Sequence, residues 1–172
     1  MNKLRKITLT AMGIALYAVL SMIAKIPIIA HISLDLGYIV FAVYCYHLGA
    51  LSGMVVGGVG CVLVSLLTSG WFPPGWLVGN LIIGAMCGVL YHRKLGMAPT
   101  IVNIIITASA VTLGILGAKT FIECHLYGIP YVVKLPKNAI ACITDAIVMS
   151  AGVLFAQRGP ITHAYWKITR GK

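Results

Sequence analysis

The sequence predicts an all-α integral membrane protein, a bundle of six transmembrane helices with both termini on the cytoplasmic side. Of its 172 residues, 60% are hydrophobic and only 9% are charged, and the mean hydropathy is +0.99. Apolar runs of roughly 17–25 residues, the length that crosses a bilayer as a helix, follow one another along the chain. The basic residues flank these runs instead of gathering on one polar face, which argues against a nucleic-acid partner. We therefore expect one transmembrane domain, residues 1–172, surrounded by membrane lipid.

The six spans are separated by connections too short to hold a soluble domain. We place them at Ile7–Ile26, Leu36–Leu51, Gly53–Thr68, Gly75–Tyr91, Thr100–Ile122 and Lys137–Gln157. The segment between the second and third spans, residues 46–52, is barely polar. A five-span arrangement with one long bent element is therefore an alternative.

The orientation follows from the basic residues, which are enriched in cytoplasmic connections. Nine of them fall on one side of the predicted membrane: Lys3, Arg5, Lys6, Arg93, Lys94, Arg158, Lys167, Arg170 and Lys172. The other side holds Lys25, Lys134 and Lys137. A cleaved signal peptide at the first span is the alternative, but its removal would place the basic C-terminal tail outside, so we reject it.

No pattern of catalytic or metal-binding residues stands out. The five cysteines are scattered without a Cys-x-x-Cys pair, which indicates small apolar fillers and no metal or haem attachment. We find no P-loop, no pair of carboxylates at catalytic spacing and no hydrolase motif. The sequence therefore predicts neither an enzyme nor a cofactor.

Small residues recur along three of the predicted spans, where they let helix backbones approach closely. In the third and fourth spans we interpret these stripes as packing within the bundle; the stripes are Gly53, Gly57 and Gly60, and Gly75, Gly79, Gly84 and Gly88. In the first span, Ala11 and Ala15 lie one turn apart beside the basic N-terminus. That stripe is a candidate docking face for another subunit.

Three segments, LTAMGIALYAVLS, LGALSGMVVGGVGCVL and PYVVKLPKNAIACITDAIV, resemble segments at the same places in the substrate-binding S-components of energy-coupling factor (ECF) vitamin transporters. The resemblance implies that Ala11 and Ala15 dock on a coupling transmembrane subunit, which works with two ATPase subunits in a prokaryotic plasma membrane. It also implies that a ligand is held in the outer half of the bundle and is released inside when the subunit topples in the membrane.

The stretch SGWFPPGWLVGN, residues 69–80, joins the third and fourth spans on the outer side. Its two prolines restrict the backbone and present Trp71. Trp76 and Asn80 are four residues apart, so they share a helix face. We predict that this stretch forms a lid and one wall of a ligand pocket, with Trp71, Trp76 and Asn80 as ligand contacts. An aromatic belt at the membrane interface is the alternative, above all for Trp71.

Placing a charged residue within an apolar membrane span costs free energy, so such residues usually have a structural or functional role. On the fifth span, Thr112, Lys119 and Glu123 are predicted to share one stripe. Helical side chains lean toward the N-terminus of their helix. The fifth and sixth spans are antiparallel, so Lys119 on the fifth span and Asp145 on the sixth are expected to approach each other. Either they form an ion pair that pins the two spans together, or they line the cavity and contact the ligand.

Further candidates lie near the outer surface. On the sixth span, Lys137 or Asn138 shares a stripe with Ala141 and Asp145, and Asn138 is a predicted ligand contact. Glu123 is another, although simple solvation is the alternative. One of the two tyrosines before the sixth span, Tyr127 and Tyr131, is expected to close over a ligand ring, with Lys134 nearby; we include Tyr131 in the predicted site.

Three more outer residues have ordinary explanations. Asp35 is expected to act as an acceptor at the start of the second span. Lys25 and His31 are within reach of an anionic ligand, although Lys25 can equally extend to the interface.

Together these features predict a binding subunit that captures a vitamin-like small molecule. The mixture of aromatic, amide and charged groups suits a flat heterocycle such as a flavin, a pterin, a purine-like base or a pyridine vitamin. A small stand-alone channel or an intramembrane enzyme is the alternative. The scarcity of polar residues in the cytoplasmic halves of the spans argues against a channel.

Overall fold

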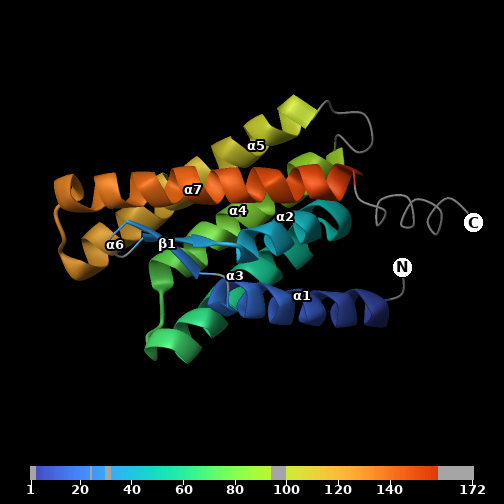
Figure 1. Ribbon diagram of the computed structural model, residues 1–172, viewed down its shortest axis with the longest axis horizontal. Coiled ribbons are helices and arrows are strands. Elements are labelled where there is room, and N and C mark those ends of the chain that lie inside the picture. The colour runs from blue at the N-terminus through green and yellow to red at the C-terminus, as the bar shows by residue number, and fades with distance from the viewer. Residues whose placement is uncertain (1–2, 24, 30–31, 94–99, 159–172) are drawn as a thin grey trace, which may run out of the picture.

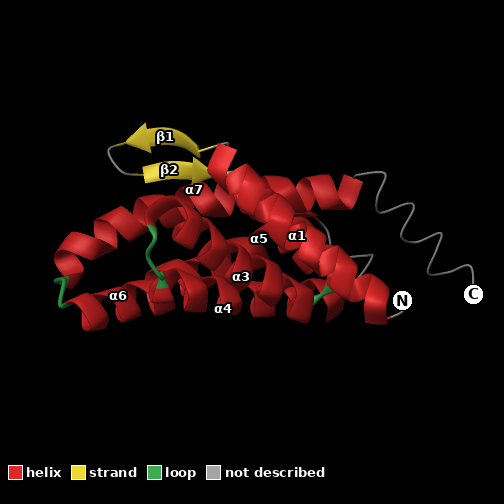
Figure 2. Cartoon of the chain, turned by 90° about the horizontal axis from the view of Figure 1, so that it is seen from below, coloured by secondary structure: helices red, strands yellow, loops and turns green. Residues whose placement is uncertain are grey.

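The computed structural model describes residues 3–23, 25–29, 32–93 and 100–158, in which long helices pack lengthwise into one bundle (Figure 1). The helices are α1 (Lys3–Ile23), α2 (Gly37–Leu48), α3 (Ala50–Ser69), α4 (Pro74–Arg93), α5 (Thr100–Thr112), the π-helix η1 (Leu113–Lys119), α6 (Thr120–Tyr127) and α7 (Tyr131–Arg158). Two short strands, β1 (Lys25–Ile29) and β2 (Ile32–Asp35), form a hairpin beside the bundle (Figure 2).

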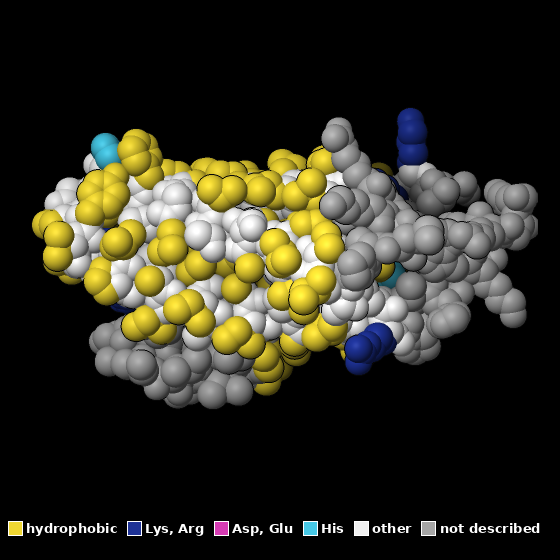
Figure 3. Space-filling view, turned by 90° about the horizontal axis from the view of Figure 1, so that it is seen from above, with side chains coloured by type: hydrophobic (Ala, Val, Ile, Leu, Met, Phe, Trp, Pro, Cys, Tyr) yellow, Lys and Arg dark blue, Asp and Glu magenta, His cyan; other side chains and the backbone are white. Residues whose placement is uncertain are grey.

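The predicted membrane bundle is confirmed. Within the described residues, five helical stretches are long and apolar enough to cross a bilayer, namely α1, α3, α4, the continuous stretch Thr100–Tyr127 and α7. The shorter α2 is the sixth apolar helix. Hydrophobic side chains cover much of the outer surface, as a bilayer requires (Figure 3). The start of α1 and the end of α7 lie at the same end of the bundle (Figure 1); that this end is cytoplasmic stays a prediction.

The first helix ends earlier than predicted, at Ile23 rather than Ile26, because the chain turns into the β-hairpin. Pro27 disfavours a helical conformation in the residue before it, and the β-branched isoleucines around it favour a strand. The strands run antiparallel and pair Lys25 with Asp35. The hairpin thus places Asp35 directly before α2.

The second and third helices fold back on each other at Gly49, so the five-span alternative is wrong. Gly49 has φ 80°, a left-handed value that glycine adopts without strain. On either side of this turn, Cys45 meets Gly53 and, further away, Phe41 meets Gly57. Contacts in this order show that α2 and α3 are antiparallel neighbours. The break that the sequence left open is a tight helical hairpin.

The glycine stripes pack helices together, as predicted for the third and fourth spans. A Cβ atom added at Gly84 would lie 2.6 Å from the backbone nitrogen of Met54, and one at Gly79 would lie 2.8 Å from the carbonyl oxygen of Gly114. Both distances are too short for a side chain, so these backbones meet directly. The five cysteines fill the interior as free, buried thiols, as expected.

The fifth span contains a π-helix that the sequence did not predict. Its wider turns rotate the residues that follow relative to those before it. As a result Thr112 is exposed, whereas Lys119 and Glu123 are buried. The predicted stripe of these three residues is therefore wrong. The rotation directs Lys119 and Glu123 toward the interior, and the helix continues to Tyr127, beyond the predicted end at Ile122.

The last helix starts six residues earlier than predicted, at Tyr131 instead of Lys137. Pro136 lies inside it and removes one backbone hydrogen bond, but it stands in the second turn, close to the exposed end. The carbonyl oxygen of Pro130 accepts the backbone N–H of Lys134 at 3.2 Å, which closes the first turn. Lys134 thus belongs to a helix face rather than to a loop.

Candidate functional site

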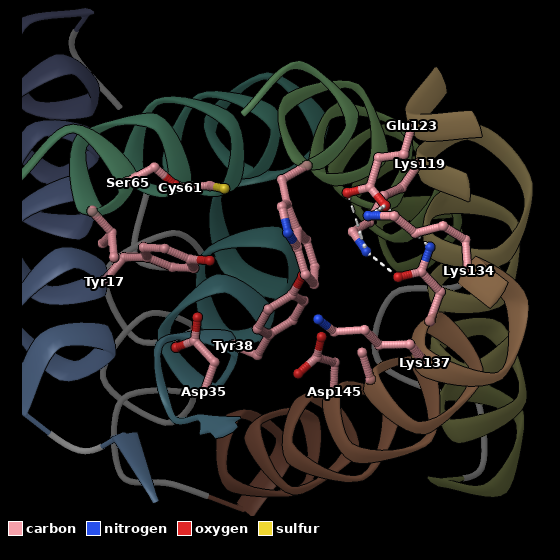
Figure 4. Close-up of a pocket in the computed structure, with 14 residues that line it drawn as sticks. Tyr17, Asp35, Tyr38, Cys61, Ser65, Lys119, Glu123, Lys134, Lys137 and Asp145 are labelled. Atoms are coloured by element: carbon pink, nitrogen blue, oxygen red, sulfur yellow. Dashed lines mark hydrogen bonds and ion pairs between the residues drawn. The ribbon is translucent and has the colours of Figure 1, made fainter. Parts of the chain in front are cut away.

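A cavity of about 320 Å³ lies between the helices, lined by Tyr17 near the C-terminal end of α1 and by Trp76 in the first turn of α4. Helices α1 to α4, η1, α6 and α7 all contribute to its wall, together with the last residue of β2. The lining residues are Tyr17, Asp35, Tyr38, Cys61, Val64, Ser65, Trp76, Lys119, Glu123, Lys134, Lys137, Asn138, Ala141 and Asp145. Figure 4 shows their side chains converging on one space.

All acidic residues of the chain line this cavity. The sequence holds three Asp and Glu residues in total, and Asp35, Glu123 and Asp145 are all lining residues. They come from β2, α6 and α7, so no single helix accounts for their meeting. In an otherwise apolar bundle, such convergence marks a polar site rather than scattered surface charges.

One end of the cavity is a hydrogen-bonded network around Glu123. Its Oε1 atom lies 3.5 Å from Nζ of Lys119, and its Oε2 atom accepts hydrogen bonds from Nζ of Lys134 at 3.1 Å and from Nδ2 of Asn138 at 3.3 Å. Lys119 also donates to Oδ1 of Asn138. Its ammonium group lies 4.1 Å from the centroid of the Trp76 ring, a cation–π distance. This end carries two lysines for one glutamate.

The other end holds the two aspartates and two tyrosines. Asp35 accepts hydrogen bonds through Oδ1 from the Ser21 hydroxyl at 2.6 Å and from the backbone N–H of Gly37 at 2.8 Å. The predicted acceptor role at the start of α2 is therefore confirmed, and Asp35 ties α2 to α1 as well. Asp145 is 3% exposed and makes no hydrogen bond or ion pair within the described part of the chain.

Asn80, a predicted ligand contact, is buried behind the cavity wall and is not among the lining residues. Its Oδ1 atom accepts a hydrogen bond from the Tyr38 hydroxyl at 2.8 Å, and its Nδ2 atom donates to the carbonyl oxygen of Gly57 at 3.3 Å. Asn80 thus fixes the ring of Tyr38, which does line the cavity. Its neighbour Trp76 lies in the wall as predicted.

Trp71 and Tyr131 lie outside the cavity lining. Trp71 is 56% exposed, and its ring packs against that of Tyr127 at 5.8 Å between centroids. Tyr131 is 46% exposed and its hydroxyl lies 3.3 Å from Nδ1 of His125. Both lie on the exposed surface, and their predicted roles as ligand contacts stay predictions. His31 and the side chain of Lys25 fall outside the described residues.

The predicted ion pair between Lys119 and Asp145 is not formed. Within the described residues Lys119 pairs with Glu123 instead, because residues four positions apart share one face of a helix. Lys119 and Asp145 nevertheless line the same cavity, together with Asn138. Of the eight predicted ligand contacts, the cavity wall includes Trp76, Lys119, Glu123, Asn138 and Asp145.

Sequence reasoning missed Tyr17 and Tyr38 in the cavity wall. Tyr17 lies on the buried face of α1, opposite the exposed Ala11 and Ala15. Its ring packs 6.3 Å from that of Tyr38. A signal was present, since Tyr17 is the one polar-tipped aromatic in the first apolar run, but nothing in the sequence pairs it with α2.

Comparisons with known proteins agree with this architecture. A family model described as "ECF-type riboflavin transporter, S component" matches residues 1–109. The chain is also similar to two proteins named UPF0397 from Streptococcus thermophilus, strains ATCC BAA-491 / LMD-9 and CNRZ 1066, at 29% identity over 93 residues, or 54% of this chain. The match covers about half (51%) of the length of these curated relatives.

Among solved structures, the chain resembles the S-component for biotin from an ECF-type ABC transporter. The TM-score is 0.63, with 92% of this chain and 93% of that chain covered, at 18% sequence identity. At this identity the likeness shows the fold alone. Because the family model spans more than half of the sequence, the chain belongs to the S-component family of ECF-type riboflavin transporters.

Proposed function

We propose that the protein is the substrate-binding subunit of an ECF-type importer and that it captures a vitamin-like heterocycle from outside the cell. The observation that carries this proposal is the cavity in which all three acidic residues of the chain meet three lysines and three aromatic rings. Such a concentration of polar groups inside a membrane bundle is costly unless a ligand uses it.

The cavity suits a small heterocycle in size and chemistry. Its volume of about 320 Å³ is at the lower end of the range for small-molecule pockets. The Trp76 ring offers a surface for stacking, and Asn138 and the lysines offer hydrogen-bond donors. Riboflavin, named by the family, is the first compound to test, and biotin, named by the structural relative, is the second.

Import would require partners, because the sequence holds no nucleotide-binding motif. We infer that a coupling transmembrane subunit docks on the exposed face of α1, where Ala11 and Ala15 lie. Met12 and Leu16 flank this stripe and are 54% and 48% exposed. Small residues let a partner helix approach closely, and two ATPase subunits would energise the complex. The cavity lies on the inner side of the same helix through Tyr17, so docking leaves it free.

The test is uptake by proteoliposomes that hold the chain alone or together with a coupling subunit and two ATPase subunits. We expect the chain alone to bind radiolabelled riboflavin or biotin but not to accumulate it. Accumulation should appear only when the partners and ATP are added. Net flux of either compound through the chain alone would contradict the proposal and favour a channel, and chemical conversion of the compound would favour an enzyme.

A further inference from the structure

Asp145 is a buried carboxylate with no partner in the described part of the chain, and it points into the cavity (Figure 4). A charged group removed from water requires a hydrogen-bond donor or an opposite charge. The hydroxyl group of Tyr38, which lines the same cavity, already donates its hydrogen bond to Asn80. Asp145 lines the cavity, so a molecule held there can supply the partner.

The lysines do not meet this need directly. Lys119 and Lys134 are held by Glu123. Lys137 extends into the same space as Asp145 (Figure 4) but forms no ion pair with it among the described residues. The two residues are eight positions apart on α7, about 12 Å along the axis at 1.5 Å per residue. Helical ion pairs form at three or four positions, not at eight.

The walls around Asp145 favour a positive charge. Tyr17 and Tyr38 line the cavity with it, and the Asp145 carboxyl group can supply a negative charge. Aromatic faces attract cations, and an aromatic enclosure with a carboxylate is a typical site for a positively charged nitrogen group. At the opposite end, Lys119 and Lys134 outnumber Glu123 and repel such a group. The electrostatics of the cavity therefore orient a cation toward Asp145.

We propose that Asp145, with the rings of Tyr17 and Tyr38, binds a positively charged nitrogen group of the transported molecule. The favoured substrate class is then a heterocycle that carries a protonated amine or a quaternary ring nitrogen. This inference rests on the proposed function, because it assumes that the cavity holds the cargo. The inference adds two properties to the proposed function: the charge of the transported molecule and its orientation in the cavity.

The experiment compares matched pairs of probes in binding titrations of the detergent-purified chain. The first pair is pyridoxamine and pyridoxine, which differ by an ammonium against a hydroxyl group. The second is thiamine and its neutral 3-deaza analogue, and riboflavin is a neutral reference. We expect the cationic member of a pair to bind at least about 10-fold more tightly, the loss that goes with one hydrogen bond to a charged group.

Three variants assign this preference to a residue. Asp145→Asn keeps the shape and removes the charge, so it should abolish the preference for the cationic probe. Asp145→Glu keeps the charge and should retain the preference. Lys137→Gln removes a charge from the same space and should leave cation binding equal or stronger. A structural role of Asp145 would lower the affinity for both members of a pair alike.

The outcomes separate the two proposals. Binding of riboflavin or pyridoxine without any preference for a cationic probe would overturn the inference and leave the proposed function intact. A preference that survives Asp145→Asn would also overturn it. Binding of none of these five probes would count against both proposals.

Discussion

The ammonium group of Lys119 lies 3.5 Å from the carboxylate of Glu123, one helical turn further along the same stretch. Their side chains are 4% and 11% exposed, so the pair is removed from water. Glu123 also accepts from Lys134 across to α7, which makes it the link between the fifth and sixth spans. The role that the sequence suggested for Asp145 in pinning these spans together belongs to Glu123.

Glu123→Gln should therefore destabilise the fold. It keeps the shape of the side chain but leaves the charge of Lys119 buried without compensation, which costs about 3 kcal/mol or more for a buried pair. Thermal unfolding of the purified protein measures this loss. His125→Gln, on the same helix but exposed, is the matched control and should change little. The double variant Lys119→Met with Glu123→Gln should recover most of the stability, and an unchanged midpoint in Glu123→Gln alone would contradict this account.

Ala11→Trp or Ala15→Trp should abolish uptake in cells while ligand binding by the isolated subunit stays nearly intact. Both alanines lie on the exposed face of α1, where an indole would hold a partner helix away without reaching the cavity. Ile105→Trp, at a lipid-facing position on α5 that is 59% exposed, is the control and should leave uptake unchanged. Equal loss of uptake and binding would contradict the docking role and indicate that Ala11 and Ala15 pack within the bundle.

Trp76→Ala should weaken ligand binding by about 1–3 kcal/mol if the ring stacks on a flat heterocycle, a range taken from base–aromatic stacking. Intrinsic fluorescence of the unmodified protein should change on addition of riboflavin, and the change should be smaller in the variant. Trp71→Ala is the comparison, because Trp71 lies outside the cavity lining. If the two variants bind alike, the Trp76 ring does not stack on the ligand.

Gly79→Ala should cost about 1–3 kcal/mol of stability, the usual effect of overpacking. Its added methyl group would meet the backbone of Gly114 at 2.8 Å, so one of the two helices would have to shift. Gly117→Ala, in the same π-helix region, meets nothing within 4 Å and should be neutral or stabilising by up to about 1 kcal/mol. Chemical unfolding of both variants checks the difference; similar values would show that α4 and η1 are not in close contact.

The fold was largely predictable, because hydropathy and helix length are local properties of the sequence. The departures come where backbone geometry overrides composition. The isoleucines around Pro27 were predicted to end a helix but form a paired strand. The chain turns at Gly49 although the sequence around it contains few polar residues. The π-helix at Leu113–Lys119 has no sequence signature that we could use, yet it decides which residues face inward.

The candidate site was predictable in part for the same reason. Lys119, Glu123 and Asp145 stand out because ionisable groups are rare in apolar spans, and they do line one cavity. The spacing of four residues between Lys119 and Glu123 allows an ion pair, but the direction in which this pair faces depends on the preceding π-helix and was not predictable. Asn80 was predicted to contact the ligand because it is a polar residue inside a span. In the structure it lies behind the cavity wall and accepts the hydrogen bond of the Tyr38 hydroxyl.

The most direct test of the central claim is native mass spectrometry of the purified chain, incubated with riboflavin, biotin and the cationic probes and compared with its Trp76→Ala variant. We predict that the unmodified protein carries one small molecule per chain, and that the variant loses it at a lower collision energy or carries none. An unmodified protein that emerges without any bound small molecule would contradict the assignment of this cavity as a substrate-binding site.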